Sequence, residues 1–174
     1  MTIEIILTVI APDRPGLVRS VADTVANNGG NWIDSAMARL GGEFAGIVRV
    51  AVPDDKATGL ETALEALSEH GISVSIRHNA PSQVLTGSKV HLEVTGQDQA
   101  GIVRDVAAAL AQHGVSVEEL RTRVFAGSMS GEALFSAEAE IIVPDGLELD
   151  TVRDALEHIA HDIMVDIEFS EIAG

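Results

Sequence analysis

The chain has 174 residues, of which 46% are hydrophobic and only 3% aromatic, so its cores must be built from Val, Ile, Leu and Ala. It contains no cysteine, which excludes disulfide frameworks, thiol catalysis and cysteine-ligated metals. The net charge of −16, with no cluster of Lys or Arg to offset it, argues against direct binding to nucleic acid.

The first predicted element is a strand. Residues 3–10 (IEIILTVI) form a nearly continuous β-branched run. Glu4 interrupts the run and no basic residue precedes it, so it is not typical of a signal peptide. No apolar run approaches the roughly 18 residues that span a membrane. We therefore expect a cytoplasmic protein without membrane contact.

A helix is predicted next, because apolar residues recur at helical spacing from Leu17 to Val25. Gly16 begins it, and Gly29 with Gly30 ends it with residues that accept positive φ.

A hairpin and a second helix follow. Residues 31–40 and 43–52 flank a Gly-Gly pair, which indicates a hairpin. Apolar residues from Leu60 to Leu67 predict the helix, which ends at Gly71. The alternating segment 72–77 predicts the last strand.

The same plan then repeats. Residues 92–107 match residues 7–22 at eight of sixteen positions, so APDRPGLVRSVA has its counterpart in GQDQAGIVRDVA. The second copy predicts a strand over 89–95, a helix ended by Gly114, a hairpin, a helix around Leu156 and a strand over 163–169. We expect domains at 1–78 and 88–174 with a linker over 79–87.

The element order βαββαβ, found twice, predicts an α+β protein of two ferredoxin-like units. Each would be a four-stranded antiparallel sheet with two helices on one face. The second hairpin is about six residues longer than the first, because the offset between the copies grows from 85 to 91. Its tip, residues 125–135, is either a lid or docking loop with Met129 exposed, or a tolerated surface insertion, which we favour.

The loop between the first strand and the first helix is the most alike part of the two copies. A helix N-terminus leaves N–H groups free for a carboxylate, and Gly16 and Gly101 let a ligand approach the backbone. Asp13 and Asp98 are placed to pair with an ammonium group. The chemistry suits a free amino acid. Alternatively, each Asp caps its helix and each Gly only forms the turn.

These residues carry a resemblance to a known family. DRPGLV, the following GGNWIDS and the repeated βαββαβ order resemble ACT domains, which are small regulatory modules that bind amino acids. The tandem arrangement, and the stretch DSAMARLGGEFAGIVRV over 34–50, are similar to the glycine cleavage system transcriptional repressor family.

The resemblance implies a ligand site at the strand–helix loop and at the start of the next strand, often where two units meet edge to edge. In the first unit the implied residues are Asp13, Arg14, Pro15, Gly16, Leu17, Val18, Asn31 and Ile33. In the second unit they are Asp98, Gln99, Ala100, Gly101, Ile102, Val103 and Ser116.

The two copies differ within these sets, so we expect the first unit to be the better site. Pro15 pre-sets φ at the helix entry and Ala100 does not. Ser116 offers fewer hydrogen bonds than Asn31, which is itself either a ligand contact or a turn residue.

The function that the resemblance implies is non-catalytic. The chain would bind a small amino acid, with glycine and serine as candidates, and act on a protein partner such as a transcription factor. The alternative is an assembly module without a ligand, forming homo-oligomers through its sheet edges. Formyltetrahydrofolate deformylases also carry an ACT-like unit, but their hydrolase domain has no counterpart here.

Catalytic and metal sites are not predicted. The pair His158 and His161, three residues apart on a helix, is more typical of a solvated face than of a metal site. No phosphate loop or dinucleotide fingerprint is present, so we expect no cofactor. The negative charge lies mostly after residue 80, where seventeen acids accompany five bases. This half is either a solvated surface, which we favour, or a docking surface for a basic partner.

Overall fold

The computed structural model describes residues 1–78 and 84–172 and shows two compact units. They comprise Met1–Ser82 and Gln83–Gly174. Most of the linker expected over 79–87 falls outside the described residues, and Gly87 already belongs to the first strand of the second unit.

The first unit has the predicted element order. Its elements are β1 (Thr2–Pro12), α1 (Leu17–Asn27), β2 (Asn31–Leu40), β3 (Glu43–Pro53), α2 (Asp54–Glu65), a 3₁₀ helix η1 (Ala66–His70) and β4 (Ser73–His78).

The second unit repeats this order without the 3₁₀ helix among its described residues. Its elements are β5 (Gly87–Gln97), α3 (Ile102–Gln112), β6 (Ser116–Ala126), β7 (Ala133–Pro144), α4 (Leu149–Ile163) and β8 (Val165–Glu171).

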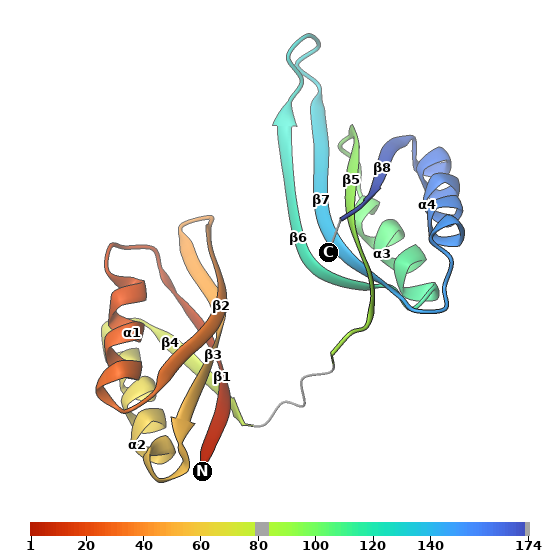
Figure 1. Cartoon of the computed structure of the whole chain (residues 1–174). Helices are drawn as coiled ribbons and strands as arrows, with labels where there is room; N and C mark the ends of the chain where they lie inside the picture. Colours follow the sequence, from red (N-terminus) through yellow and green to blue (C-terminus); the bar gives the residue numbers. More distant parts are fainter. Residues whose placement is uncertain (79–83, 173–174) are drawn as a thin grey trace. The chain divides into compact units, whose positions relative to one another are not determined.

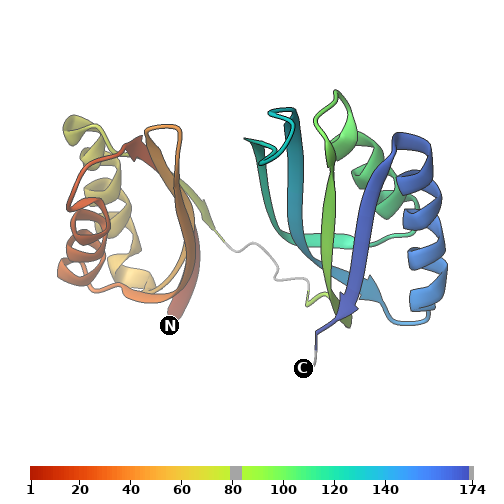
Figure 2. The same ribbon diagram turned by 90° about the horizontal axis from the view of Figure 1, so that it is seen from above.

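Each unit is one antiparallel sheet with its helices on one face (Figures 1 and 2). The strand orders are β2-β3-β1-β4 and β6-β7-β5-β8. The expected fold class, two ferredoxin-like ACT-type units, is confirmed. This order leaves β2 and β4, and β6 and β8, at the sheet edges, and the β1–α1 and β5–α3 loops each follow a central strand.

Alternation on the central strands builds the cores. From Ile5 to Ala11, every second residue of β1 is buried against the helices. On α1, Leu17, Val21 and Val25 bury one stripe, at the spacing of a helix face. The core is therefore aliphatic, as the composition requires.

One predicted boundary is wrong. The final strand was expected from Ile163, but Ile163 is the last residue of α4. The helix ends at Met164 in the left-handed conformation, with φ 54 and ψ 49. The corresponding end of η1 uses Gly71, with φ 79. A methionine at this position gave no sequence signal for a helix end.

The two hairpins differ at their tips. Gly41 and Gly42, both at positive φ, join β2 to β3. The longer turn between β6 and β7 leaves Met129 99% exposed, and Gln97 Nε2 donates to Glu132 Oε2 at 2.8 Å near its base. Figure 1 shows this hairpin extending past the neighbouring strand β5.

Within residues 1–78 and 84–172, none of the helices is both long enough and apolar enough to cross a membrane.

Candidate functional site

The bend before α1 has the conformation that its glycine permits. Gly16 lies at φ 87 and ψ 5, in the left-handed region, and Gly101 before α3 lies at φ 94 and ψ 2. The loop is tied to the neighbouring hairpin, because the Asp13 amide donates to the Gly42 carbonyl at 2.8 Å. The Asp98 amide donates likewise to Ala133 at 2.9 Å.

The helix N-termini carry no side-chain cap from any part of the chain that the structure describes. The Asp13 carboxylate, 30% exposed, instead accepts a hydrogen bond from Arg39 Nη1 at 3.3 Å. The capping interpretation of Asp13 is therefore wrong for this structure. The first amides of α1 thus receive no side-chain cap, and an anion is favoured at such a helix start.

Arg14 and Gln99 have the same structural role although their side chains differ chemically. The Arg14 guanidinium donates to the His70 carbonyl at the end of η1. The Gln99 amide donates to the Ile163 carbonyl at the end of α4. Both residues thus tie the loop to the last turn of the unit's second helical segment, and both have long side chains with a terminal N–H.

The space beside the two bends differs. A Cβ built on Gly16 would meet no atom within 4 Å, whereas one on Gly101 would lie 2.8 Å from Arg104 Nη2. Arg104 also pairs with Asp105, at 3.0 Å. The equivalent Arg19 instead pairs with Asp23 along the helix, at 3.5 Å. The first bend is open and the second lies beneath a guanidinium.

The helix residues of the predicted sites divide into two groups. Leu17 and Ile102 are buried in the cores, at 6% and 3% exposure. Val18 and Val103 are exposed at the surface, at 47% and 42%. Pro15 and Ala100 are exposed in the loops. The second residue of each helix is therefore the one that a bound molecule would contact.

The structure does not bring Asn31 to the Gly16 bend of the same unit. Asn31 pairs with Ala51, which lies opposite Glu4, whereas the bend follows Pro12 at the other end of β1. Eight strand residues separate these ends, about 27 Å at 3.4 Å per residue. In the second unit, Ser116 pairs with Ile142, which lies opposite Lys89, so Ser116 is likewise eight strand residues from Gln97 at the other end of β5. Ile33, 40% exposed, lies at a bulge beside Asn31.

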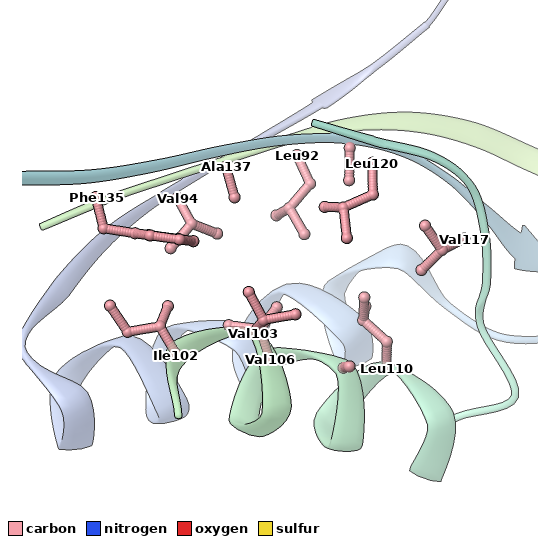
Figure 3. Close-up of a pocket in the computed structure, with 12 residues that line it drawn as sticks. Leu92, Val94, Ile102, Val103, Val106, Leu110, Val117, Leu120, Phe135 and Ala137 are labelled. Atoms are coloured by element: carbon pink, nitrogen blue, oxygen red, sulfur yellow. The ribbon is translucent and has the colours of Figure 1, made fainter. Parts of the chain in front are cut away.

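An apolar recess in the second unit was not predicted from sequence. It lies between α3 and the strands β5, β6 and β7, with a volume of about 50 Å³ (Figure 3). Ile102 and Val103 of the predicted site belong to its lining. A comparison of the two repeats contains the signal that would have revealed it, since Val117 and Ala139 replace the larger Trp32 and Val48.

Charged groups on the open sheet face of the first unit form a local network. Arg49 donates to both carboxylate oxygens of Asp34, at 2.9 and 2.7 Å, and lies 3.6 Å from Glu4. The hydrogen bond from Arg49 lowers the pKa of the Asp34 carboxyl. This network stabilises the sheet edge and contains no group with the reactivity of a catalyst.

Two of the histidines lie close to groups of their own helices. His158 lies 3.6 Å from Asp162 on the exposed side of α4, and His113 Nδ1 lies 2.9 Å from the Ala109 carbonyl. In the described part of the chain, no three side chains of His, Asp or Glu are grouped as a metal site would require.

Comparisons with known proteins agree with this fold. A family model described as ACT domain matches residues 4–77 and 89–170. The fold is similar to that of an unknown protein from Galdieria sulphuraria, with a TM-score of 0.88 and 30% identity over 99% of this chain and 100% of that one. It is also similar to a protein proposed to be a glycine cleavage system transcriptional repressor, with a TM-score of 0.78 and 22% identity over 100% and 99% of the two chains. No curated protein sequence gives a significant match.

Proposed function

Because the chain belongs to the ACT domain family, with one copy in each unit, we propose that it is a non-catalytic regulator that senses a small amino acid. The open, uncapped bend at Gly16 is the observation that carries this proposal. Free amides there suit the carboxylate of the ligand, and the half-exposed Asp13 suits its ammonium group.

Glycine and serine are the favoured ligands of this site. Leu17 is turned into the core and Val18 is the apolar residue left at the bend, so the surface offers little to a long side chain. The likeness to a protein proposed to be a glycine cleavage system transcriptional repressor supports the same choice. By that analogy, the partner is a regulatory protein such as a transcription factor.

The separation of Asn31 from the bend suggests how a ligand would transmit a signal. A small molecule that contacts both would need the bend of one ACT domain and the edge strand of another, such as that of a second copy of the chain. Ligand would then favour one arrangement of units, and the partner distinguishes the arrangements. A tenfold difference in affinity supplies about 1.4 kcal/mol of coupling.

Assembly without a ligand is the second candidate function, and the long edge strands favour it. Nearly all residues of β2 and β6 are exposed, including Leu40 at 83% and Val124 at 56%. Edge strands of this kind pair readily with other chains.

Isothermal titration calorimetry of the full chain against the twenty amino acids separates the two functions. We expect saturable heat with glycine or serine. Absence of heat with every amino acid at millimolar concentration, together with a concentration-dependent oligomer, would replace the sensor with the assembly module.

A further inference from the structure

The second unit contains a hydrocarbon-lined recess between α3 and its sheet. Figure 3 shows Ile102, Val103, Val106 and Leu110 of α3 facing side chains that project from the sheet. All twelve lining side chains are hydrocarbon: Leu92, Val94, Ile102, Val103, Val106, Ala107, Leu110, Val117, Leu120, Phe135, Ala137 and Ala139. Water inside such a recess finds no side-chain hydrogen-bond partner.

Two substitutions between the repeats remove side-chain volume at this place, although Leu110 and Leu120 are larger than their counterparts Val25 and Ser35. Trp32 of β2 and Val117 of β6 occupy the same register position, opposite Val50 and Ile141. Val48 and Ala139 likewise both lie opposite a leucine of the central strand. In the first unit Trp32 packs against the core and Val48 is fully buried. The second unit therefore lacks an indole ring and two methyl groups at this place.

The recess is open at the sheet edge. Its floor, with Leu92, Val94 and Ile102, is at most 3% exposed, whereas Val103, Val117 and Leu120 around its mouth are 42%, 46% and 49% exposed. A molecule in solution therefore has access through the mouth without displacing the core.

The mouth also lies next to the Gly101 bend. Val103 is two residues after Gly101, a separation of about 5–6 Å between Cα atoms in a helix. The Arg104 guanidinium lies over the same bend and pairs with Asp105 at 3.0 Å, so a ligand carboxylate would share or replace that partner. A carboxylate held there would leave its attached side chain within reach of the recess.

We propose that this recess binds the side chain of an aliphatic amino acid, so that the two units sense different ligands. This inference rests on the proposed sensing function and names the ligand class of the second unit. The recess of about 50 Å³ is several times the 10–15 Å³ that one water needs, and about a third of a 150 Å³ cavity that holds benzene. The volume fits the branched end of a valine, leucine or isoleucine side chain and is too small for an aromatic ring.

The test is calorimetry of leucine, phenylalanine, glycine and serine against the full chain and filled variants. Ala139→Val and Val117→Trp each restore the residue of the first unit. We expect leucine to bind the wild type at least tenfold more tightly than phenylalanine does. We expect each filled variant to weaken leucine at least tenfold without changing glycine or serine binding.

Ala111→Val is the matched control, because Ala111 is exposed on α3 and is not part of the lining. It should leave leucine binding unchanged. Thermal unfolding identifies the variants that fold. If Val117→Trp does not fold, the smaller change, Ala139→Val, decides the result.

The outcomes distinguish this inference from the proposed function. Unchanged leucine affinity in a folded Ala139→Val variant, or glycine or serine binding without any leucine binding, would overturn the aliphatic recess alone. Absence of binding by every amino acid would overturn the sensing function and this inference together.

Discussion

At the residue scale, the candidate site depends on glycines that hold a left-handed bend. Gly16 and Gly101 both lie near φ 90, where any side chain costs about 1–2 kcal/mol. Both units thus need a residue that adopts positive φ at this bend, which explains why both copies have glycine there. The difference lies in the surroundings, since the first bend is open and the second is beneath Arg104.

Replacing Gly16 with Val should abolish the binding of glycine or serine, because the new side chain occupies the open space beside the amides. Gly101→Val should affect this binding far less. Gly146→Val is the matched control, since Gly146 also lies at φ 89 with open space beside it. Calorimetry on all three variants measures the effect, and equal losses in the Gly16 and Gly101 variants would contradict the assignment to the first unit.

The Asp34–Arg49 pair predicts a pH dependence with a definite sign. Its hydrogen bond lowers the pKa of the Asp34 carboxyl in the folded state below its ordinary value of 3.8. The stability it contributes is therefore present above the unfolded pKa and is lost as pH falls through the folded pKa.

Asp34→Asn should accordingly lower stability slightly at pH 7 and have a smaller effect at strongly acidic pH, because the contribution of the carboxylate is lost as pH falls through the folded pKa. Urea unfolding of the variant and the wild type at the two pH values measures the difference. The effect is small because the pair is exposed to solvent. A stability difference that is independent of pH would show that Asp34 acts through packing.

At the element scale, each strand–helix loop is tied to the end of another helical segment. Arg14 and Gln99 are different residues at equivalent positions, yet both donate to a carbonyl at that end. The tether fixes the direction in which α1 or α3 leaves the loop. The N–H donors of Arg14 and Gln99 are already engaged by these carbonyls. The two side chains therefore fix the conformation of the loop.

Exchange of the tethers should therefore be tolerated. Arg14→Gln should keep most of the stability, whereas Arg14→Ala should lose about 1 kcal/mol, the contribution of one such hydrogen bond. Chemical denaturation measures the stability, and amide hydrogen exchange at the start of α1 reports the local effect. If Arg14→Gln and Arg14→Ala were equally destabilised, the hydrogen bond to His70 would not be the cause.

The end of α4 offers a stabilising substitution. Met164 adopts φ 54 and is 80% exposed, so it bears backbone strain without gaining much burial. Met164→Gly, which copies Gly71 of the first unit, should raise the free energy of unfolding by about 1 kcal/mol. Thermal or urea unfolding tests this. A lower stability of the glycine variant would mean that the methionine side chain packs favourably there.

Sequence periodicity predicted most of these elements, and the reasons for the exceptions are physical. The Gly-Gly pair marked the first hairpin, and Gly71 marked a helix end. Met164 ends α4 without such a residue, so the helix was expected to stop earlier. Loop residues were identified by repetition, but the roles of Arg14 and Gln99 depend on carbonyls 56 and 64 residues away, which spacing within a motif does not encode.

At the scale of the whole molecule, one scaffold carries two different surfaces. On the open sheet face of the first unit, Ile10 and Ile47 are 45% and 55% exposed. The equivalent positions of the second unit hold Thr95 and Glu138. The cores diverge as well, since the second unit has the recess where Trp32 packs against the core of the first unit. The duplication thus preserves the fold and the bend while the contacts available to ligands and partners differ.

The most direct measurement follows the backbone amides of the full chain by ¹H–¹⁵N NMR during titration with glycine and with serine. We expect saturable shifts centred on Gly16, Leu17 and Val18, with Asp13 affected, because the free amides of α1 receive the carboxylate. Unshifted amides at this bend, with either ligand at saturating millimolar concentration, would contradict it.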